Sequence, residues 1–247
     1  MLSFLFLINI KNIQKPAFTN LLLFLLVVVA MFVTGGRSAF LGLCAGMLFL
    51  LLFAGVHYRK YIIAGCLAGG LLVAFFSRSL IIFNREDDIN NSFDFRASIW
   101  NDAYKIYKSH PFLGIGIGNY KEFVSRYSQD QFLVLEDEIV WLDQPENGYL
   151  KILTEFGAPG FFLVFSLILG PVIGAMRAWF KKQTDGRVFL FIAPIVSWLV
   201  SFVSLYSLSD RRNLIVLATM LCLLIFSSNR VKITHEEQFD PTYNESV

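Results

Sequence analysis

The residues best suited to chemistry gather in one polar interval, residues 84–157, of an otherwise apolar chain. Four carboxylates in this interval could together bind a divalent cation, because hard cations prefer clustered carboxylate oxygens: Glu136, Asp137, Glu138 and Asp143. Their run lacks the fixed spacing of an EF-hand loop. A solvated acidic loop is the simpler interpretation, and we predict no metal site.

A glycine-rich run, GIGIGN, places Gly114, Gly116 and Gly118 at alternate positions. It lacks the G-x-G-x-x-G spacing, the flanking βαβ pattern and the lysine of phosphate-binding loops. We therefore expect these glycines to form a turn in which two backbones approach each other, and not a nucleotide site.

Other cofactor and nucleic-acid sites are not indicated. The cysteines Cys44, Cys66 and Cys222 all lie in apolar runs, where a thiol usually acts as a small buried hydrophobe. The three histidines are far apart in the sequence and have no zinc-ligand spacing. The formal net charge is only +2 and no basic tract is present, so we predict no cofactor and no nucleic-acid partner.

Four arginines are candidates for binding anions. Arg37 lies between two apolar runs, where a charge must snorkel, pair or face a polar cavity, and by residue type alone it is an interfacial anchor. Arg96 falls on an amphipathic helix, where contact with solvent or lipid headgroups is the simpler interpretation. Arg211 and Arg212 precede the last apolar run, and either is able to meet a phosphate or an anionic lipid headgroup.

The elements that position these groups are membrane helices. The chain is 55% hydrophobic and 16% charged with a mean hydropathy of +0.58, which excludes an ordinary soluble globular protein. A helix needs roughly 20 mostly apolar residues to cross the bilayer, with roughly 17 sufficing for a short span. Six segments qualify: residues 17–34, 39–56, 61–76, 158–176, 188–206 and 214–228. We predict an all-α polytopic membrane protein with one long external loop.

The distribution of Lys and Arg predicts the orientation, since these residues prefer cytoplasmic connections. One set of helix ends carries most of them: Lys11, Lys15, Arg59, Lys60, Arg177, Lys181, Lys182, Arg187, Arg230 and Lys232. The opposite short connections carry Arg37, Arg211 and Arg212. Both termini are therefore expected in the cytoplasm. The expected organisation is a stump (1–16), three spans (17–83), an external loop with the site (84–157), three spans (158–228) and a cytoplasmic tail (229–247) that is disordered after Lys232.

Three short helices are predicted inside the external loop. Apolar residues recur at helical spacing between Asp94, a candidate N-cap, and Pro111, which ends that helix. A second helix is expected to follow Asn119. A third is expected over residues 147–156, leading through GAPG into the next span. Glu146 therefore lies at the mouth of a helix beside the bilayer surface.

Four motifs in order resemble the O-antigen ligase and polymerase family of bacterial inner membranes: TGGRSAF, RASIW, HPFLGIGIGNY and PENGYLKILTEFGAPG. The resemblance covers residues 34–170 and falls on what would be the C-terminal portion of a family member. It implies transfer of a polyprenyl-pyrophosphate-linked glycan to a hydroxyl on another glycan or on lipid A core. The expected site faces the periplasm, and the expected partners are this donor, the acceptor and membrane lipids.

The resemblance also implies roles for individual residues. Arg37 and Arg96 would neutralise the leaving pyrophosphate, which suits the planar guanidinium. Glu146 stands where relatives often have histidine and would be the general base. Four further residues are expected to bind substrate: Asn147, Tyr149, Arg211 and Arg212. By residue type alone Tyr149 is a packing or interfacial aromatic, and Glu155 is expected to pair with a basic residue or cap local backbone.

The alternative is a non-catalytic membrane protein, such as a lipid-linked glycan transporter or an assembly subunit, or an inactive fragment. A transporter is expected to have polar or helix-breaking residues in the middle of its spans. Here these are few, with Pro171 and Pro194 the main ones. The sequence therefore favours the enzyme.

Overall fold

The computed structural model describes most of the chain from residue 89 onward and parts of the region before it. The described residues are 22, 26–31, 37–53, 63, 89–127, 132–135, 138–141, 144–184, 186, 188–204, 208 and 210–239. Most of the predicted spans at residues 61–76 and 17–34 lies outside them, as do the acidic residues Glu136, Asp137 and Asp143.

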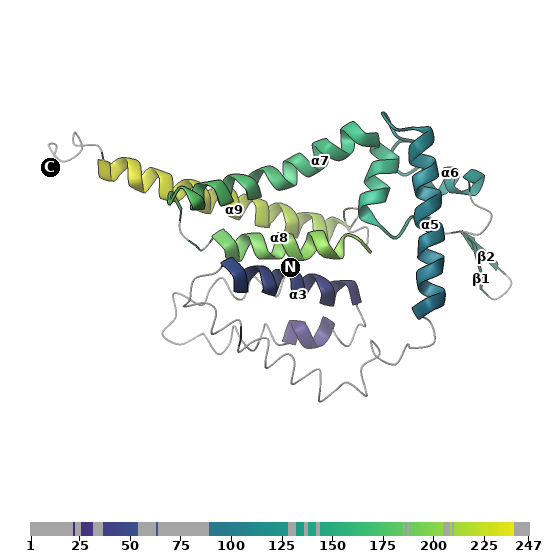
Figure 1. Ribbon diagram of the computed structural model, residues 1–247, viewed down its shortest axis with the longest axis horizontal. Coiled ribbons are helices and arrows are strands. Elements are labelled where there is room, and N and C mark those ends of the chain that lie inside the picture. Colours follow the sequence, from purple (N-terminus) through teal and green to yellow (C-terminus); the bar gives the residue numbers. More distant parts are fainter. Residues whose placement is uncertain are drawn as a thin grey trace.

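Four helices run alongside one another and form an apolar bundle (Figure 1). They are α3 (Arg37–Phe53), α7 (Gly148–Phe180), α8 (Val188–Ser201) and α9 (Arg211–Phe239). Their facing sides bury large apolar side chains, among them Leu50, Phe189, Ile192, Met220 and Leu224. Both α7 and α8 continue across a proline, Pro171 and Pro194 respectively.

The helix α3 is antiparallel to α8. Gly42, near the start of α3, lies against the backbone of Ser197 near the end of α8. At the other end, the rings of Phe49 and Phe53 lie 6.0 and 5.6 Å from the ring of Phe189. Arg37 therefore begins α3 at the same end of the bundle at which α8 finishes.

Two of the described helices are long and apolar enough to cross a membrane by length and composition, namely α7 and the Arg211–Ser228 part of α9. The apolar helices α3 and α8 are shorter. These four coincide with the predicted spans at residues 39–56, 158–176, 188–206 and 214–228. The complete six-span arrangement stays a prediction.

The last helix extends further than predicted. We expect the last span to end at residue 228 and the chain to be disordered after Lys232, yet α9 is helical through Phe239. The sequence between these points contains no glycine or proline, and the first helix-breaking residue is Pro241. Nothing therefore stops the helix at Ser228, where the apolar stretch ends.

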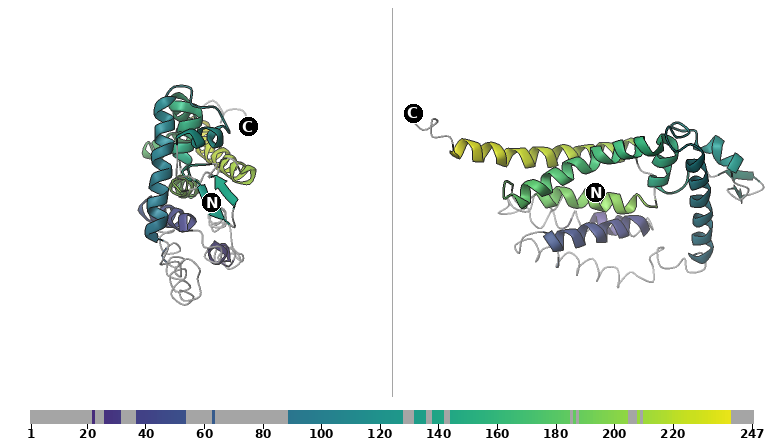
Figure 2. Two further views of the ribbon diagram at one scale, coloured as in Figure 1. Left: turned by 90° about the vertical axis from the view of Figure 1, so that its right-hand side faces the viewer. Right: turned by 45° about the horizontal axis from the view of Figure 1, so that its top comes forward.

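One end of the bundle carries a separate polar layer, which we call the platform (Figure 2). It consists of α5 (Ile89–Ser109), α6 (Tyr120–Tyr127), the intervening residues 110–119, which we call the glycine turn, and the first part of α7, residues 148–156. In Figures 1 and 2, α5 runs across the end of the bundle, transverse to the other long helices. A small core joins these parts: Ala103, Ile106, Ile115, Tyr120 and Val124.

The predicted amphipathic helix is confirmed, but its beginning was wrong. It starts at Ile89, so Asp94 lies inside α5 and is not its N-cap. No glycine or proline interrupts the sequence from Ile89 to Ser109, and the helix therefore extends toward the N-terminus. The predicted helix after Asn119 is confirmed as α6.

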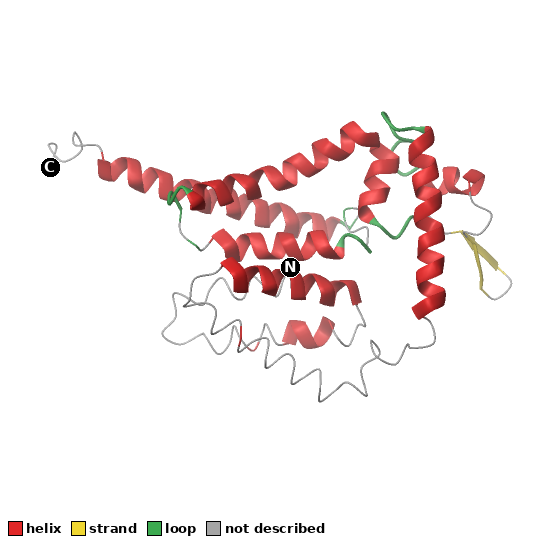
Figure 3. Cartoon of the chain, in the orientation of Figure 1, coloured by secondary structure: helices red, strands yellow, loops and turns green. Residues whose placement is uncertain are grey.

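The helical class is confirmed for most of the described chain, with one addition. Strands β1 (Phe132–Leu135) and β2 (Glu138–Trp141) pair antiparallel, with Phe132 opposite Trp141 (Figure 3). The sequence FLVL-ED-EIVW does contain the signal, because two runs of β-branched and aromatic residues flank a two-residue connection. We had treated it as an acidic loop.

Candidate active site

Two of the predicted catalytic residues, Arg96 and Glu146, form an ion pair. The distance from Arg96 Nε to Glu146 Oε2 is 3.4 Å, and the two side chains are 41% and 42% exposed. Arg96 comes from α5 and Glu146 from the segment that enters α7, 50 residues later in the chain. The fold thus brings the arginine predicted to bind phosphate and the predicted base together in a partly exposed position.

The backbone at Glu146 is unusual. Its φ is +44°, in the left-handed region that residues other than glycine seldom adopt. Such conformations cost of order 1–3 kcal/mol and are often found at functional sites. The next residues hold it in place, because the N–H of Gly148 donates to the carbonyl of Phe202 at 2.9 Å.

Asn147 is the N-cap of α7. Its side-chain oxygen accepts hydrogen bonds from the N–H groups of Tyr149 and Leu150, at 3.0 and 3.2 Å. These are two of the donors that an α-helix leaves unpaired at its start. Asn147 is 8% exposed, so its first role here is to fix the direction of α7 immediately after Glu146.

Tyr149 makes structural contacts. Its hydroxyl donates to the carbonyl of Leu199 at 2.7 Å, and its ring stacks on Phe165 with centroids 5.2 Å apart. The ring of Phe202 meets it edge-on, also at 5.2 Å. These contacts agree with the packing role expected from residue type, and they join the start of α7 to the end of α8.

The remaining predicted arginines lie at the same end of the bundle. Arg37 is the first residue of α3, beside the end of α8, and only its backbone is described. Arg211 and Arg212 begin α9, which follows α8 after a short connection. Arg212 Nε lies 3.5 Å from Asp210 Oδ1, and both arginines are exposed. The structure thus gathers every predicted site residue at one end, with direct contact between Arg96 and Glu146.

The glycine turn is a backbone joint and does not present its N–H groups to a phosphate. Ile115 N–H donates to the carbonyl of Thr154 at 2.9 Å and Gly116 N–H to that of Glu155 at 3.0 Å. Gly118 N–H donates to the Glu155 carboxylate at 3.2 Å. The close approach of backbones that we predicted from the three glycines is confirmed.

The other side of this joint is a break in α7. Gly157 has φ +67° and ψ −176°, and Ala158 N–H donates across the joint to the carbonyl of Pro111 at 2.8 Å. A β-carbon on Gly157 would collide with the carbonyl group of Phe112, and one on Gly114 would collide with that of Glu155. Both positions therefore require glycine for space as well as for conformation.

Glu155 has the structural role that we expected. Its carboxylate is 1% exposed, accepts the Gly118 N–H and lies 3.8 Å from Lys151 Nζ one turn earlier. It lies in the polar part of α7, before the apolar stretch that starts at Ala158. Burial raises the pKa of the Glu155 carboxyl, while Lys151 and the Gly118 N–H act in the opposite direction. Lys151 was not singled out from the sequence, although its i,i+4 spacing from Glu155 is a usable signal.

Another polar chain at the end of α5 was also missed. The Tyr127 hydroxyl donates to Ser109 Oγ at 2.9 Å, and this oxygen lies 2.9 Å from His110 Nδ1. Ser109 Oγ also donates to the Ile106 carbonyl at 2.7 Å. The three side chains come from α5, the glycine turn and α6, and no sequence spacing announces that they meet.

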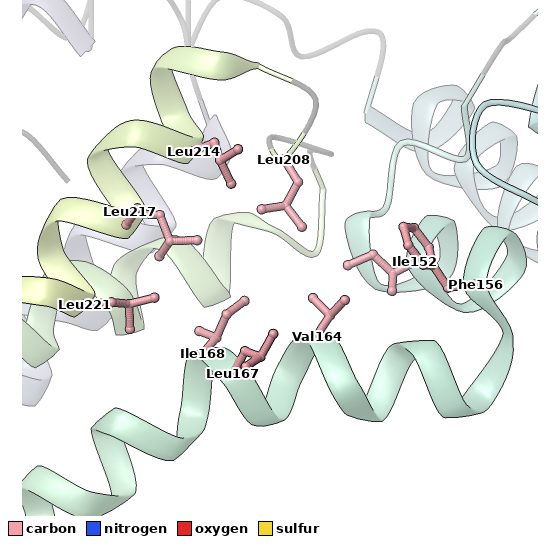
Figure 4. A pocket seen from close by; sticks show the side chains of 10 residues that line it. Ile152, Phe156, Val164, Leu167, Ile168, Leu208, Leu214, Leu217 and Leu221 are labelled. Atoms are coloured by element: carbon pink, nitrogen blue, oxygen red, sulfur yellow. The ribbon is translucent and has the colours of Figure 1, made fainter. Parts of the chain in front are cut away.

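An apolar cavity of about 340 Å³ lies between α7 and α9 (Figure 4). Figure 4 shows Ile152 and Phe156 at one side of it and Leu214 and Leu217 at another. Every residue lining the cavity is apolar. Ile152 lies in the helix that Asn147 caps, and Leu214 lies in the first turn of the helix that Arg211 begins, so the cavity adjoins the polar end of the bundle. Among the described residues, no group of three His, Cys, Asp or Glu side chains is placed to hold a metal ion.

Apolar helices, two of them long enough to cross a membrane, end in a polar platform with a partly exposed arginine–glutamate pair, an arrangement typical of a membrane protein. The O-antigen ligase family matches residues 22–165, which is more than half of the chain and includes Arg37, Arg96 and Glu146. The chain belongs to the O-antigen ligase family. No curated protein matches it.

Family membership confirms the resemblance read from the four motifs. It places the chain among membrane proteins that process glycans, with ligase- or polymerase-type glycosyltransferase activity in general. It also implies lipid-linked glycan donors and glycan acceptors in general. Arg211 and Arg212 lie outside the matched residues.

Proposed function

We propose that this protein transfers a polyprenyl-pyrophosphate-linked glycan to an acceptor hydroxyl, in assembly of O-antigen or a related surface polysaccharide. The observation that carries the proposal is the ion pair between Arg96 and Glu146, 3.4 Å apart and partly exposed at the end of the bundle. It joins the two kinds of group that the reaction needs, a cation for a leaving phosphate and a base for a hydroxyl proton.

The reaction involves one bond made and one broken at the anomeric carbon of the donor sugar. The acceptor oxygen attacks that carbon, and the bond from the carbon to the pyrophosphate oxygen breaks. Glu146 takes the proton of the acceptor hydroxyl. The polyprenyl pyrophosphate leaves with the bonding electron pair, and Arg96 and Arg37 neutralise its charge.

The ion pair suggests how the two residues work together. A partly exposed pair of this kind is worth only about 0.2–1 kcal/mol, so exchanging partners costs little. The pyrophosphate presents two oxygens to the guanidinium of Arg96, a stronger bidentate arrangement than a contact through Nε alone. Arg96 then turns to the donor and leaves the Glu146 carboxylate to the acceptor hydroxyl.

The surroundings support the same assignment. The cavity between α7 and α9 offers an apolar surface for part of the polyprenyl chain. Exposed Arg211 and Arg212 begin α9 close to this cavity. The break in α7 falls at Gly157, at the start of its apolar part and not in the middle of the span. A transporter is expected to break its helices near the middle of the membrane, so this position favours the enzyme.

The test is glycan transfer by membranes that contain the full chain, supplied with a radiolabelled lipid-linked glycan and either lipid A core or glycan as acceptor. Glu146→Gln keeps the size of the side chain but removes its basicity, and we expect transfer to fall about 10²- to 10⁴-fold. Glu146→His should restore part of the rate. Single transfer to lipid A core indicates a ligase, and a ladder of lengthened glycans indicates a polymerase.

The matched control is Lys105→Gln, which removes another ion pair of α5, that of Lys105 with Asp102 at 2.8 Å. It should transfer at the normal rate. Normal transfer by Glu146→Gln would leave Glu146 as a carboxylate that only favours the start of α7 through the helix dipole.

Orientation is tested separately by cysteine labelling with a membrane-impermeant reagent, after replacing the three native cysteines. We propose that the platform faces the periplasm, as the Lys and Arg distribution predicts. Ser125→Cys on exposed α6 should react in intact cells, and Lys181→Cys at the far end of α7 should react only after lysis. The reverse pattern would place the site in the cytoplasm.

A further inference from the structure

The glycine turn carries three large apolar side chains that the rest of the described chain leaves uncovered. Phe112, Leu113 and Ile117 are 75%, 89% and 72% exposed. Other exposed apolar side chains among the described residues mostly belong to the apolar helices of the bundle. Connecting loops usually face water and carry polar residues. This turn is therefore an exposed apolar tip on an otherwise polar platform.

Several N–H groups of the turn are already hydrogen-bonded, which lowers the cost of moving this part of the chain to the edge of a bilayer. The N–H groups of Ile115 and Gly116 donate to carbonyls of α7, and that of Gly118 donates to Glu155. The N–H of Gly114 donates to the carbonyl of His110 at 3.1 Å. The turn can thus present apolar side chains to lipid without also presenting those donors.

The position of the turn along α7 fixes its depth. Its Pro111 carbonyl accepts the N–H of Ala158, the residue at which the polar part of α7 gives way to its apolar span. Exposed Phe162 and Leu163 follow about one turn later on that span. The turn is therefore joined to α7 where its apolar stretch begins, and this is the level at which we expect the boundary between headgroups and hydrocarbon.

The basic residues near the turn also suit contact with a lipid surface. Lys105 and Lys108 are exposed on α5, the helix that leads into the turn and crosses the end of the bundle. Lysine side chains at this level suit phosphate headgroups, while aromatic and aliphatic side chains suit the layer beneath. A bilayer offers both kinds of surface at once, so we infer lipid as the partner.

We propose that the glycine turn is a membrane wedge, whose Phe112, Leu113 and Ile117 enter the leaflet next to the platform. The wedge holds the end of α5 at the membrane surface, independently of the reaction that the platform performs. Because the turn is bonded to α7, the wedge and the entry point of the span form one rigid unit.

The test uses the full chain without its native cysteines, reconstituted in vesicles of three parts phosphatidylcholine to one part phosphatidylglycerol. Leu113→Cys and, separately, Ile117→Cys are labelled with the environment-sensitive dye NBD. Both side chains are well exposed, so the substitutions remove little packing. The matched control is Glu122→Cys on the exposed face of α6.

The wedge predicts blue-shifted emission at both turn positions and at least twofold quenching by lipids brominated near the headgroup. It also predicts protection from aqueous iodide, with the control position showing the opposite behaviour. Iodide quenching equal to that of the control would overturn the proposal. A blue shift that brominated lipid does not quench, and that disappears when the protein is diluted tenfold with plain lipid, would overturn it in favour of contact with a second copy.

Discussion

The α3–α8 contact and the α5–α7 contact are both helix junctions, but they are built from different interactions. The first is formed by apolar side chains such as Leu50, Phe189 and Ile192, whose burial is roughly proportional to area and not directional. The second combines a small core with directional hydrogen bonds through the glycine turn and one partly exposed ion pair. The bundle therefore tolerates substitutions of similar volume, whereas the platform depends on individual atoms.

The largest expected effect is at the break in α7. Gly157→Ala places a β-carbon against the carbonyl of Phe112, in a φ/ψ region that is essentially restricted to glycine. We expect a loss of about 3 kcal/mol or more in stability, seen as proteolysis of the platform at lower temperature. Gly170→Ala in the bundle is the control, because a β-carbon there meets nothing within 4 Å. Equal stability of the two variants would show that the platform is no more sensitive to substitution than the bundle.

A smaller effect, on activity and not on folding, is expected at the ion pair. Arg96→Lys keeps the charge but loses the planar fork, and we expect transfer to fall about 10²-fold, the scale of losing one preorganised donor. The unfolding free energy should change by less than about 0.5 kcal/mol, since the pair is partly exposed. The converse exchange Lys105→Arg should change neither quantity. A normal rate in Arg96→Lys would mean that only charge is required.

A moderate effect on stability is expected at the helix cap. Asn147→Ala removes the acceptor for two N–H groups at the start of α7, and we expect a loss of about 1 kcal/mol. Hydrogen exchange at Tyr149 and Leu150 should quicken, while that in α8 should not. Asn101→Ala, at an exposed position within α5, is the matched substitution and should cost nothing. Slower exchange or no change at Tyr149 would show that Asn147 does not act as a cap.

The smallest expected effect is on stability, and it separates backbone strain at Glu146 from the role of its side chain. Glu146→Asn and Glu146→Gln both lose the ion pair and the base, but Asn tolerates a left-handed backbone better. We expect the Asn variant to be more stable than the Gln variant by about 0.5–1 kcal/mol, with neither variant transferring glycan at the normal rate. Equal midpoints of thermal unfolding would show that the backbone at Glu146 is not strained.

The sequence predicted the elements that depend on local pattern. The apolar helices, the amphipathic α5, the α6 helix after Asn119 and the helix mouth at Glu146 all follow from periodicity and from capping or breaking residues. The predicted start of α5 was wrong. Asp94 resembles an N-cap, but no residue just before it stops the helix. The β1–β2 hairpin was missed because charge was given more weight than strand pattern.

The candidate site was predictable as a set of residues but not as a geometry. Four short motifs carried Arg37, Arg96 and Glu146, and the family match includes all three. The contact between Arg96 and Glu146 depends on how α5 crosses the bundle, which no local spacing encodes. The hydrogen bond from the Tyr149 hydroxyl to the Leu199 carbonyl likewise depends on the packing of α7 against α8.

The break at Gly157 also has a consequence for biogenesis. The carbonyls of Thr154 and Glu155 receive their hydrogen bonds from Ile115 and Gly116, residues synthesised roughly 40 positions earlier. The ribosome therefore delivers the donors before the acceptors, and the glycine turn cannot complete these hydrogen bonds until the start of α7 has been synthesised. Assembly of the platform therefore follows the synthesis of the start of α7 and cannot precede it.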